Sequence, residues 1–176
     1  MTHHEILISG IGGQGVLFLT KLLYEAALHQ GLPVFAYEIH GMSQRGGSVF
    51  SALKLGDSQS PQLFPGNVDT LICLESSELF AHIQYLKSDG AIILNDSSLT
   101  NDQSIWLDEQ TYTTFKYNSD RDALSLGNPR ISNLVLLGRY LDENSFIIKQ
   151  DTILSILPSL VKPSLLQLNR RAFIGQ

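Results

Sequence analysis

The sequence contains one cysteine, Cys73, among 176 residues. A lone thiol cannot form an intramolecular disulfide, and it cannot hold an iron–sulfur cluster by itself, because such a cluster needs about four thiolates. Redox chemistry linked to this chain would therefore use a metal of another chain. His3 and His4 lie beside the N-terminus, where a metal site is rarely built, so we expect no metal ion to bind.

Charged residues are also scarce, at 16% of the chain, and the formal net charge is −5. Lysine and arginine are scattered along the sequence. A protein that neutralises many phosphates needs a basic patch, so nucleic acid is not an expected partner. The low share of charged residues leaves room for a surface that faces another protein.

Long apolar runs are missing as well. No stretch reaches the roughly 18 apolar residues that cross a bilayer, and the first ten residues lack the basic region and cleavage site of a secretory signal. We therefore expect a cytoplasmic protein without membrane contact. The sequence has no internal repeat, low-complexity segment or linker, and a chain of this length can bury its own core, so we expect residues 1–176 to form one domain.

The sequence does contain alternating strand and helix patterns. Residues 5–9 form a short apolar run, a glycine cluster follows, and residues 16–29 carry apolar side chains at helical spacing. A Gly-Leu-Pro break then precedes residues 34–38, which favour a second strand. These segments predict an opening β-α-β unit like that of the Rossmann fold.

The next segments depart from the dinucleotide-binding pattern, because residues 48–55 favour a strand where that pattern has a helix. Residues 105–117 favour one or two irregular strands, and Pro158 predicts a break in the helix around it. We expect an α/β fold of three layers, with a mostly parallel sheet and a helical C-terminal third. The remaining predicted elements are strands over 69–75 and 91–95 and helices over 77–87, 133–142, 151–161 and 163–172.

The first glycine segment lies between a predicted strand and a predicted helix. Gly10, Gly12 and Gly15 match the G-x-G-x-x-G pattern, and Gly13 adds conformational freedom. In that pattern the first glycine permits a tight turn, the second allows close approach of a ligand or backbone, and the third lets strand and helix pack. Free amide groups at the start of the helix would then attract an anion.

Glu38 lies 23 residues after Gly15, near the end of the second predicted strand. A dinucleotide site places its ribose-binding acid at about this position, so nicotinamide nucleotide binding stays open. Alternatively, the glycines only form the turn and Glu38 pairs with Arg45. The residues themselves do not decide between the two.

A second glycine segment joins two predicted strands. It combines an imidazole, a guanidinium and small polar side chains, but no nucleophile or second base lies beside the histidine, so we expect no catalytic residue. The segment is either a structural connection or a polar surface that docks against a partner. Its residues are His40, Gly41, Met42, Ser43, Gln44, Arg45, Gly46 and Gly47.

These segments together resemble the gamma subunit of 2-oxoacid:ferredoxin oxidoreductases. The resemblance runs from about residue 5 to residue 175, and the form of the second segment is most similar to the beta subunit of indolepyruvate:ferredoxin oxidoreductase. Several spaced motifs in order are far more specific than one glycine pattern. The matching stretches are GIGGQG, EIHGMSQRGGSV, SPQLFPGNVDTLICLE, LGNPRISNLVLLG and NRRAFIG.

The resemblance implies a subunit of an enzyme that oxidatively decarboxylates a 2-oxoacid to an acyl-CoA and passes electrons to ferredoxin. It implies that thiamine diphosphate, Mg²⁺ and the iron–sulfur clusters are held mainly by partner subunits, which this chain would contact directly. The sequence agrees, since it has too few cysteines for a cluster and no Gly-Asp-Gly thiamine diphosphate motif. We expect the isolated chain to bind none of these cofactors and to be inactive.

The resemblance also assigns residues to a glycine-rich rim that faces a cofactor or a partner. Glu75 and Asn95 end two predicted strands where open α/β sheets collect ligands, so we place them on the same edge, although Asn95 could equally cap a helix or turn. Two other functions stay open: an independent oxidoreductase that binds a dinucleotide through Gly10–Gly15 and Glu38, and a small-molecule sensor. The predicted rim comprises Gly10, Gly12, Gly13, Gln14, Gly15, the second segment from His40 to Gly47, Glu75 and Asn95.

Overall fold

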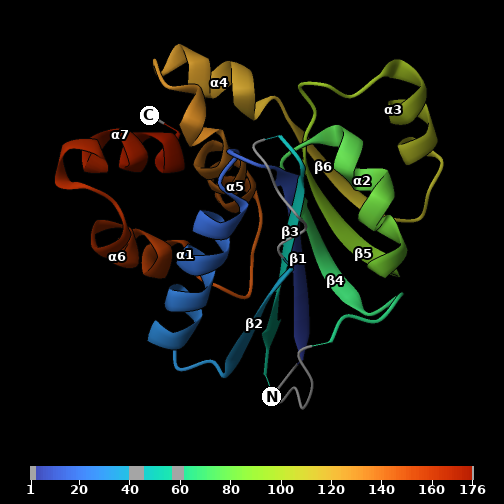
Figure 1. Cartoon of the computed structure of the whole chain (residues 1–176), viewed down its shortest axis with the longest axis horizontal. Helices are drawn as coiled ribbons and strands as arrows, with labels where there is room; N and C mark the ends of the chain where they lie inside the picture. Colours follow the sequence, from blue (N-terminus) through green and yellow to red (C-terminus); the bar gives the residue numbers. More distant parts are fainter. Residues whose placement is uncertain (1–2, 40–45, 57–61, 176) are drawn as a thin grey trace.

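The computed structural model describes residues 3–39, 46–56 and 62–175 (Figure 1). Its strands are β1 (His4–Ile11), β2 (Val34–Ile39), β3 (Ser48–Leu55), β4 (Val68–Cys73), β5 (Leu86–Asn95) and β6 (Thr113–Tyr117). Its helices are α1 (Val16–His29), α2 (Ser76–His82), α3 (Asn101–Asp108), α4 (Ser119–Ser125), α5 (Ser132–Glu143), α6 (Gln150–Leu160) and α7 (Pro163–Ile174). Two short 3-10 turns are η1 (Ile83–Tyr85) and η2 (Pro129–Ile131).

The strands form one six-stranded sheet in the order β2-β3-β1-β4-β5-β6. The β1, β4, β5 and β6 strands pair in parallel, whereas β3 is antiparallel to both β1 and β2. The predicted α/β class and mostly parallel sheet are therefore confirmed. The first β-α-β unit differs from a Rossmann unit, because β3 inserts between β1 and β2.

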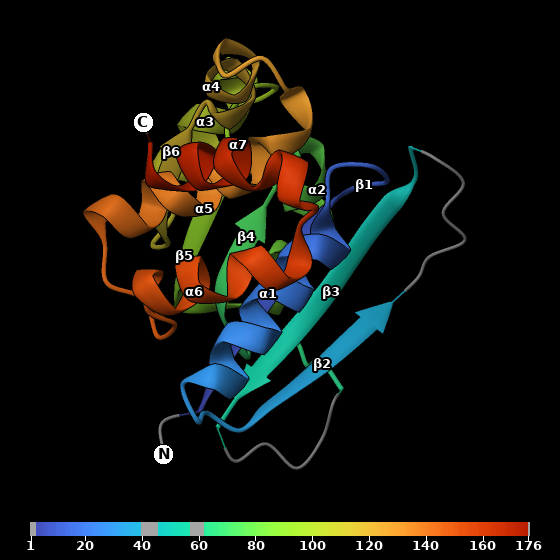
Figure 2. The same ribbon diagram turned by 90° about the vertical axis from the view of Figure 1, so that its left-hand side faces the viewer.

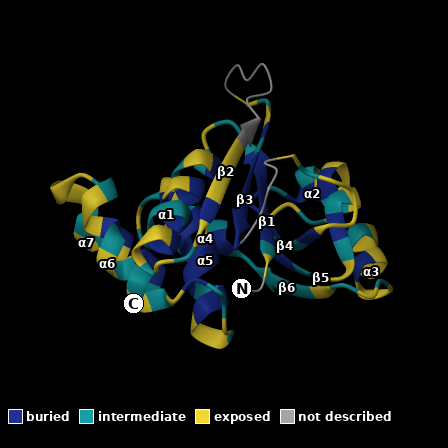
Figure 3. Ribbon diagram, turned by 90° about the horizontal axis from the view of Figure 1, so that it is seen from below, coloured by how far each residue is buried: buried dark blue, intermediate teal, exposed yellow. Residues whose placement is uncertain are grey.

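Helices cover both faces of the sheet and make the expected three layers. The α1, α5, α6 and α7 helices lie on one side, and α2 and α3 lie on the other (Figures 1 and 2). Side chains of β1 alternate between the two cores: Ile6 and Ile8 pack under α1, and Leu7 packs on the opposite face. The outer strand β2 is largely exposed (Figure 3), with Phe35 53% exposed.

Most predicted elements are present, and the three C-terminal helices are confirmed. The prediction for residues 105–117 was wrong in its first half, where α3 ends and a strand was expected. A capping box explains the helix: the Thr100 hydroxyl accepts the amide of Gln103 at 3.3 Å, and the Gln103 side chain accepts the amide of Thr100 at 3.0 Å. The cap therefore starts a helix at Asn101, and the strand preference of the threonines and tyrosines that follow is realised only in β6.

The expected break at Pro158 is also wrong, because α6 runs through this residue to Leu160. Proline removes one amide donor from a helix, and its cost is smallest where few further turns depend on that bond. Pro158 lies in the last turn, and the amide of Val161 still donates to the carbonyl of Leu157 at 3.2 Å. The helix therefore tolerates the proline and ends two residues later.

Cys73 is fully buried at the end of β4, and burial raises the pKa of its thiol to about 12. The thiol also donates to the carbonyl of Glu75 at 2.9 Å. Burial suppresses the thiolate, which is the reactive species. We expect Ellman's reagent at pH 8 to leave the native thiol unmodified over hours and to modify it fully in denaturant. Rapid labelling of the native protein would contradict the buried position.

No described helix is both long enough and apolar enough to cross a membrane.

Candidate functional site

The carboxyl ends of the parallel strands meet at one edge of the sheet, where the candidate site lies. The chain leaves β1 toward α1 on one face and leaves β4 toward α2 on the opposite face (Figure 1). Adjacent strands that diverge in this way open a crevice at their carboxyl ends, which is the usual ligand position in open α/β sheets. The first glycine segment and Glu75 follow these two strands directly.

The turn after β1 needs glycine at two positions. Gly13 has a φ of 105° and Gly15 a φ of 84°, a region that side chains with a Cβ rarely adopt. Gly12, the position predicted to allow close approach of a ligand, does not have a positive φ, so its backbone conformation does not require glycine. At Gly15 a Cβ would lie 2.3 Å from Nδ2 of Asn133, and that amide donates to the Gly15 carbonyl at 3.2 Å.

The described end of the second glycine segment, Gly46 and Gly47, lies beside the first turn. The amide of Gly12 donates to the carbonyl of Gly47 at 2.9 Å, which ties the first turn to the residue before β3. Gly46 has a φ of 96° and completes this approach. The predicted residues His40, Gly41, Met42, Ser43, Gln44 and Arg45 lie outside the described residues.

A chain of hydrogen bonds fixes the first turn to the end of β4. The Gln14 side-chain oxygen accepts the amide of Ile11 at 2.9 Å, and its Nε2 donates to Oε2 of Glu75 at 2.9 Å. The other oxygen of Glu75 accepts the hydroxyl of Ser98. Glu75 therefore holds the turn in place through Gln14, which joins two predicted rim positions, Gln14 and Glu75, in one region.

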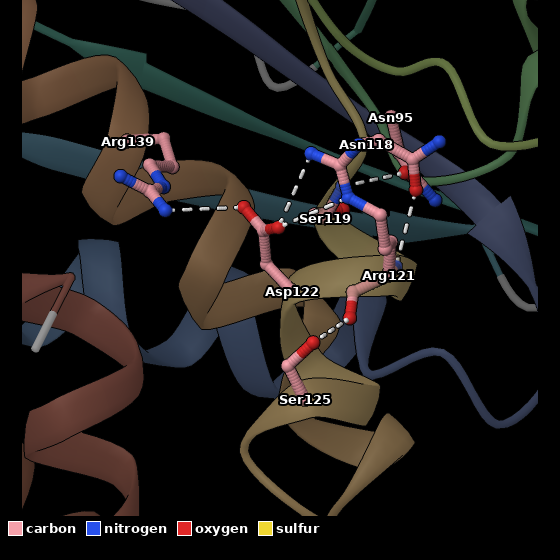
Figure 4. Close-up of polar contacts among 7 residues, drawn as sticks. All are labelled: Asn95, Asn118, Ser119, Arg121, Asp122, Ser125 and Arg139. Carbon is pink, nitrogen blue, oxygen red and sulfur yellow. Dashed lines mark hydrogen bonds and ion pairs between the residues drawn. The ribbon is translucent and has the colours of Figure 1, made fainter.

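Asn95 is buried at the end of β5 and acts as a cap. Its Oδ1 accepts the amide of Ser119 at 3.1 Å, and Oδ1 of Asn118 accepts the amide of Arg121 at 3.1 Å, so both asparagines secure the start of α4 (Figure 4). The Nδ2 of Asn95 donates to the carbonyl of Leu74 at 3.2 Å. Of the two expectations for Asn95, its contacts are those of a cap.

Sequence reasoning did not single out the residues that complete the edge. A cavity of about 140 Å³ adjoins the glycine turn, and a carboxylate, Asp120, lines it. Burial would raise the pKa of Asp120, but hydrogen bonds from Ser132, Ser97 and Asn95 outweigh it and lower the pKa, so this carboxylate is ionised at neutral pH. The remaining lining residues are Gly13, Gln14, Leu74, Pro129, Arg130, Ser132 and Asn133.

The donor set of the described residues does not fit a metal ion or an iron–sulfur cluster. No group of three histidine, cysteine or carboxylate side chains in the described ranges could hold a metal ion. The one thiol of the chain is buried and protonated, so it cannot serve a cluster. The edge instead offers backbone amides, carboxamides, hydroxyls and the carboxylates of Glu75 and Asp120, which suit binding and orientation.

A sequence model of the pyruvate ferredoxin/flavodoxin oxidoreductase family matches residues 5–174. The chain belongs to this family. It is a gamma-type subunit of a 2-oxoacid:ferredoxin oxidoreductase, and the family expected from the spaced motifs is confirmed.

Curated members of this family match over nearly their whole length. The indolepyruvate oxidoreductase subunit IorB of Thermococcus kodakarensis is 30% identical over 190 residues, which cover 98% of this chain and 94% of that protein. IorB of Pyrococcus horikoshii is 30% identical over 189 residues with the same two shares. The chain therefore spans nearly the whole length of these two relatives.

Solved structures of family members share the fold. The gamma subunit of a keto/oxoacid ferredoxin oxidoreductase from Geobacter sulfurreducens superposes with a TM-score of 0.77 at 24% identity, over 97% of this chain and 94% of that one. A 2-oxoglutarate:ferredoxin oxidoreductase from Magnetococcus marinus gives a TM-score of 0.81 at 17% identity, over 98% of this chain and 30% of that longer chain.

The sheet order argues against an independent dinucleotide site in this family member. A Rossmann site needs its ribose-binding acid on the strand beside β1, whereas β3 separates β1 from β2 here. Neighbouring strands lie about 4.8 Å apart, so β2, which contains position 38, lies about 10 Å from β1. The side chain of Glu38 lies outside the described part of the structure.

Replacing Gln14 with leucine should lower the free energy of unfolding by about 1–2 kcal/mol, because the Ile11 amide and Glu75 both lose a partner. Denaturant unfolding measures this change. The matched control is Gln110→Leu, since Gln110 bonds only an exposed helix carbonyl, and its effect should stay within about 0.5 kcal/mol. Equal effects of the two substitutions would show that the hydrogen bonds of Gln14 do not stabilise the turn.

Proposed function

We propose that this chain is the gamma-type subunit of a CoA-dependent oxidoreductase that decarboxylates an aryl 2-oxoacid such as indolepyruvate and reduces ferredoxin. Thiamine diphosphate, Mg²⁺ and the iron–sulfur clusters belong to companion subunits. The observation that carries the proposal is the match to IorB proteins along nearly the whole of both chains. The lone buried thiol supports the assignment of the clusters to companion subunits, since one cysteine cannot ligate an iron–sulfur cluster.

In this proposal the glycine-rich rim is the face that meets the thiamine-bearing partner. The Gly12–Gly47 hydrogen bond between the first turn and the described end of the second segment supports this proposal, and so does the Gln14–Glu75 bond, which restrains the turn. A preorganised rim loses little conformational freedom when it binds, which favours assembly. The described rim residues bind and orient, and the proposal assigns them no proton transfer or covalent step.

The proposal is tested on the complex purified from the native host through a tag on this chain. We expect thiamine-binding and iron–sulfur polypeptides to co-purify and the complex to reduce viologen with CoA and indolepyruvate faster than with pyruvate or 2-oxoglutarate. A preference for pyruvate or 2-oxoglutarate would refute the substrate. Binding of NAD or NADP by the isolated chain, without partner subunits, would refute the subunit role and support the dinucleotide-binding alternative.

A further inference from the structure

The β2 strand (Val34–Ile39) is an unprotected edge of the sheet (Figure 2). Edge strands expose unpaired backbone groups, and soluble proteins usually shield them with a proline, a lysine or a bulge. The β2 strand contains neither proline nor lysine, and its register with β3 is unbroken. It also exposes two aromatic side chains, Phe35 and Tyr37. The opposite edge strand, β6, carries Lys116 and so follows the usual rule.

The free backbone groups of β2 belong to every second residue. The amide of Gly56 donates to the carbonyl of Pro33 at 2.8 Å, which makes these two residues a hydrogen-bonded pair that extends the antiparallel β2–β3 ladder. Such pairs alternate along a ladder, so the odd-numbered residues of β2 bond to β3 and the even-numbered residues present their amides and carbonyls to the outside. The outward-facing residues are Val34, Ala36 and Glu38.

A groove of about 390 Å³ runs between β2 and α1. Leu17 and Tyr24 of α1 and Ala36 of β2 give it apolar walls. Lys21 and Glu25 also line it, one helical turn apart. Within the described ranges, neither of these two charged side chains forms an ion pair or a hydrogen bond. The groove therefore presents one free charge of each sign beside an open strand.

We propose that β2 pairs antiparallel with β2 of a second copy of this chain, which joins two six-stranded sheets into one. A two-fold axis perpendicular to the sheet keeps like faces together, so Ala36 lies opposite the partner's Ala36, and Val34 lies opposite the partner's Glu38. These residues carry the free amides and carbonyls, so about six backbone hydrogen bonds form without disturbing the bonds to β3. On the face away from α1, Phe35 lies beside the partner's Tyr37, and cross-strand aromatic pairs stabilise a sheet.

The charges of α1 favour a second copy over a different partner. The α1 helix packs most extensively on β3, and three strand spacings of about 4.8 Å separate β3 from the partner's β3, so the two α1 helices lie about 14 Å apart. Long side chains span that distance. Because the two helices are antiparallel, Lys21 faces the partner's Glu25, and Glu25 faces the partner's Lys21. A surface of one charge sign would satisfy only one of the two residues.

The joined sheet leaves both glycine-rich rims accessible. The paired strands run in opposite directions, so the carboxyl ends of the parallel strands of the two copies lie at opposite ends of the joined sheet. Each copy can therefore meet a thiamine-bearing partner of its own. The pairing of β2 does not depend on the subunit role proposed above.

Analytical ultracentrifugation of the full chain tests the pairing. We expect a monomer–dimer equilibrium that depends on concentration, and we expect Ala36→Pro to weaken the dimer at least about tenfold, because two backbone bonds at the axis are lost. Proline is tolerated at an edge position whose amide faces outward, so thermal unfolding should show that this variant keeps its fold. A wild type that stays monomeric at about 100 μM, or a folded Ala36→Pro that dimerises like the wild type, would refute the proposal.

Charge exchange in α1 tests the second copy without changing β2. Lys21→Glu and Glu25→Lys should each weaken the dimer about threefold, as expected for exposed ion pairs. The double variant should regain the wild-type affinity, because opposite charges then face each other again. A double variant no better than either single variant would show that α1 does not face the partner's α1.

A cysteine at the axis locates the contact. In a hydrogen-bonded antiparallel pair the two Cα atoms lie about 5.5 Å apart, a distance that a disulfide spans. Native Cys73 is buried, so the introduced thiol is the reactive one. We expect mild oxidation of Ala36→Cys to give a covalent dimer, whereas Leu124→Cys, in the exposed part of α4, should give little. Equal cross-linking at the two positions, or none at position 36, would place the dimer contact elsewhere and refute the assignment.

Discussion

Gly138→Ala is expected to lower the free energy of unfolding by about 3 kcal/mol. Gly138 lies in α5, and a Cβ there would sit 1.9 Å from the carbonyl oxygen and 2.7 Å from the carbonyl carbon of Phe173. Both atoms belong to the backbone of α7, so the whole helix must move rather than one flexible side chain. In an isolated helix the same change would stabilise by about 1 kcal/mol.

Denaturant unfolding of the wild type and Gly138→Ala measures the effect, and hydrogen exchange locates it. We expect the substitution to speed exchange more in α7 than in β4, because the close contact at Gly138 joins α5 to α7. A variant as stable as the wild type, or more stable, would follow helix propensity and contradict the close packing. Gly138 and Phe173 lie in two of the stretches that carry the family resemblance, so this contact joins those stretches in the fold.

Gly15→Ala is expected to lower the free energy of unfolding by about 2–3 kcal/mol and to disrupt the glycine turn. A φ of 84° costs a residue with a Cβ about 1–2 kcal/mol, and displacing the Asn133 amide removes a hydrogen bond worth about 1 kcal/mol. Because the turn belongs to the rim, assembly with the partner subunits should weaken as well. Unfolding curves and co-purification yields measure the two effects.

Two comparisons separate strain from steric overlap at Gly15. Gly13→Ala is the matched control, since its φ is 105° but a Cβ there meets nothing within 4 Å, so only strain remains. In an Asn133→Ala background, Gly15→Ala should lose the part of its cost that comes from Asn133. Additive effects of the two substitutions would show that Asn133 does not press on Gly15.

Periodicity and glycine punctuation predicted the fold well where each element is decided locally. The bounds of α1 and β3 agree with those predicted, because Gly15, Gly31 and the second glycine segment mark their ends. The sequence did not predict the α3 helix although Thr100 and Gln103 form a capping box, because a four-residue cap is a weaker signal than the strand preference of the residues that follow. Sheet order could not be predicted, because the pairing of β3 with β1 is a long-range choice.

The candidate site was predictable only in part. Glycine spacing identified the turn, and strand ends indicated Glu75 and Asn95. The Gln14–Glu75 bond and the Asn133–Gly15 contact join residues that are 61 and 118 positions apart, so no local pattern announces them. Asn133 lies in a stretch that carried the resemblance, yet its role as the neighbour of Gly15 appears only in three dimensions.

Hydrogen–deuterium exchange of the free chain and of the assembled oxidoreductase tests the docking face most directly. We predict that assembly slows exchange most in peptides covering Gly10–Gly15 and Gly46–Ser48, while peptides from α3 stay unchanged. Protection confined to α3 or another distant surface, with the two glycine segments exchanging as in the free chain, would contradict the account.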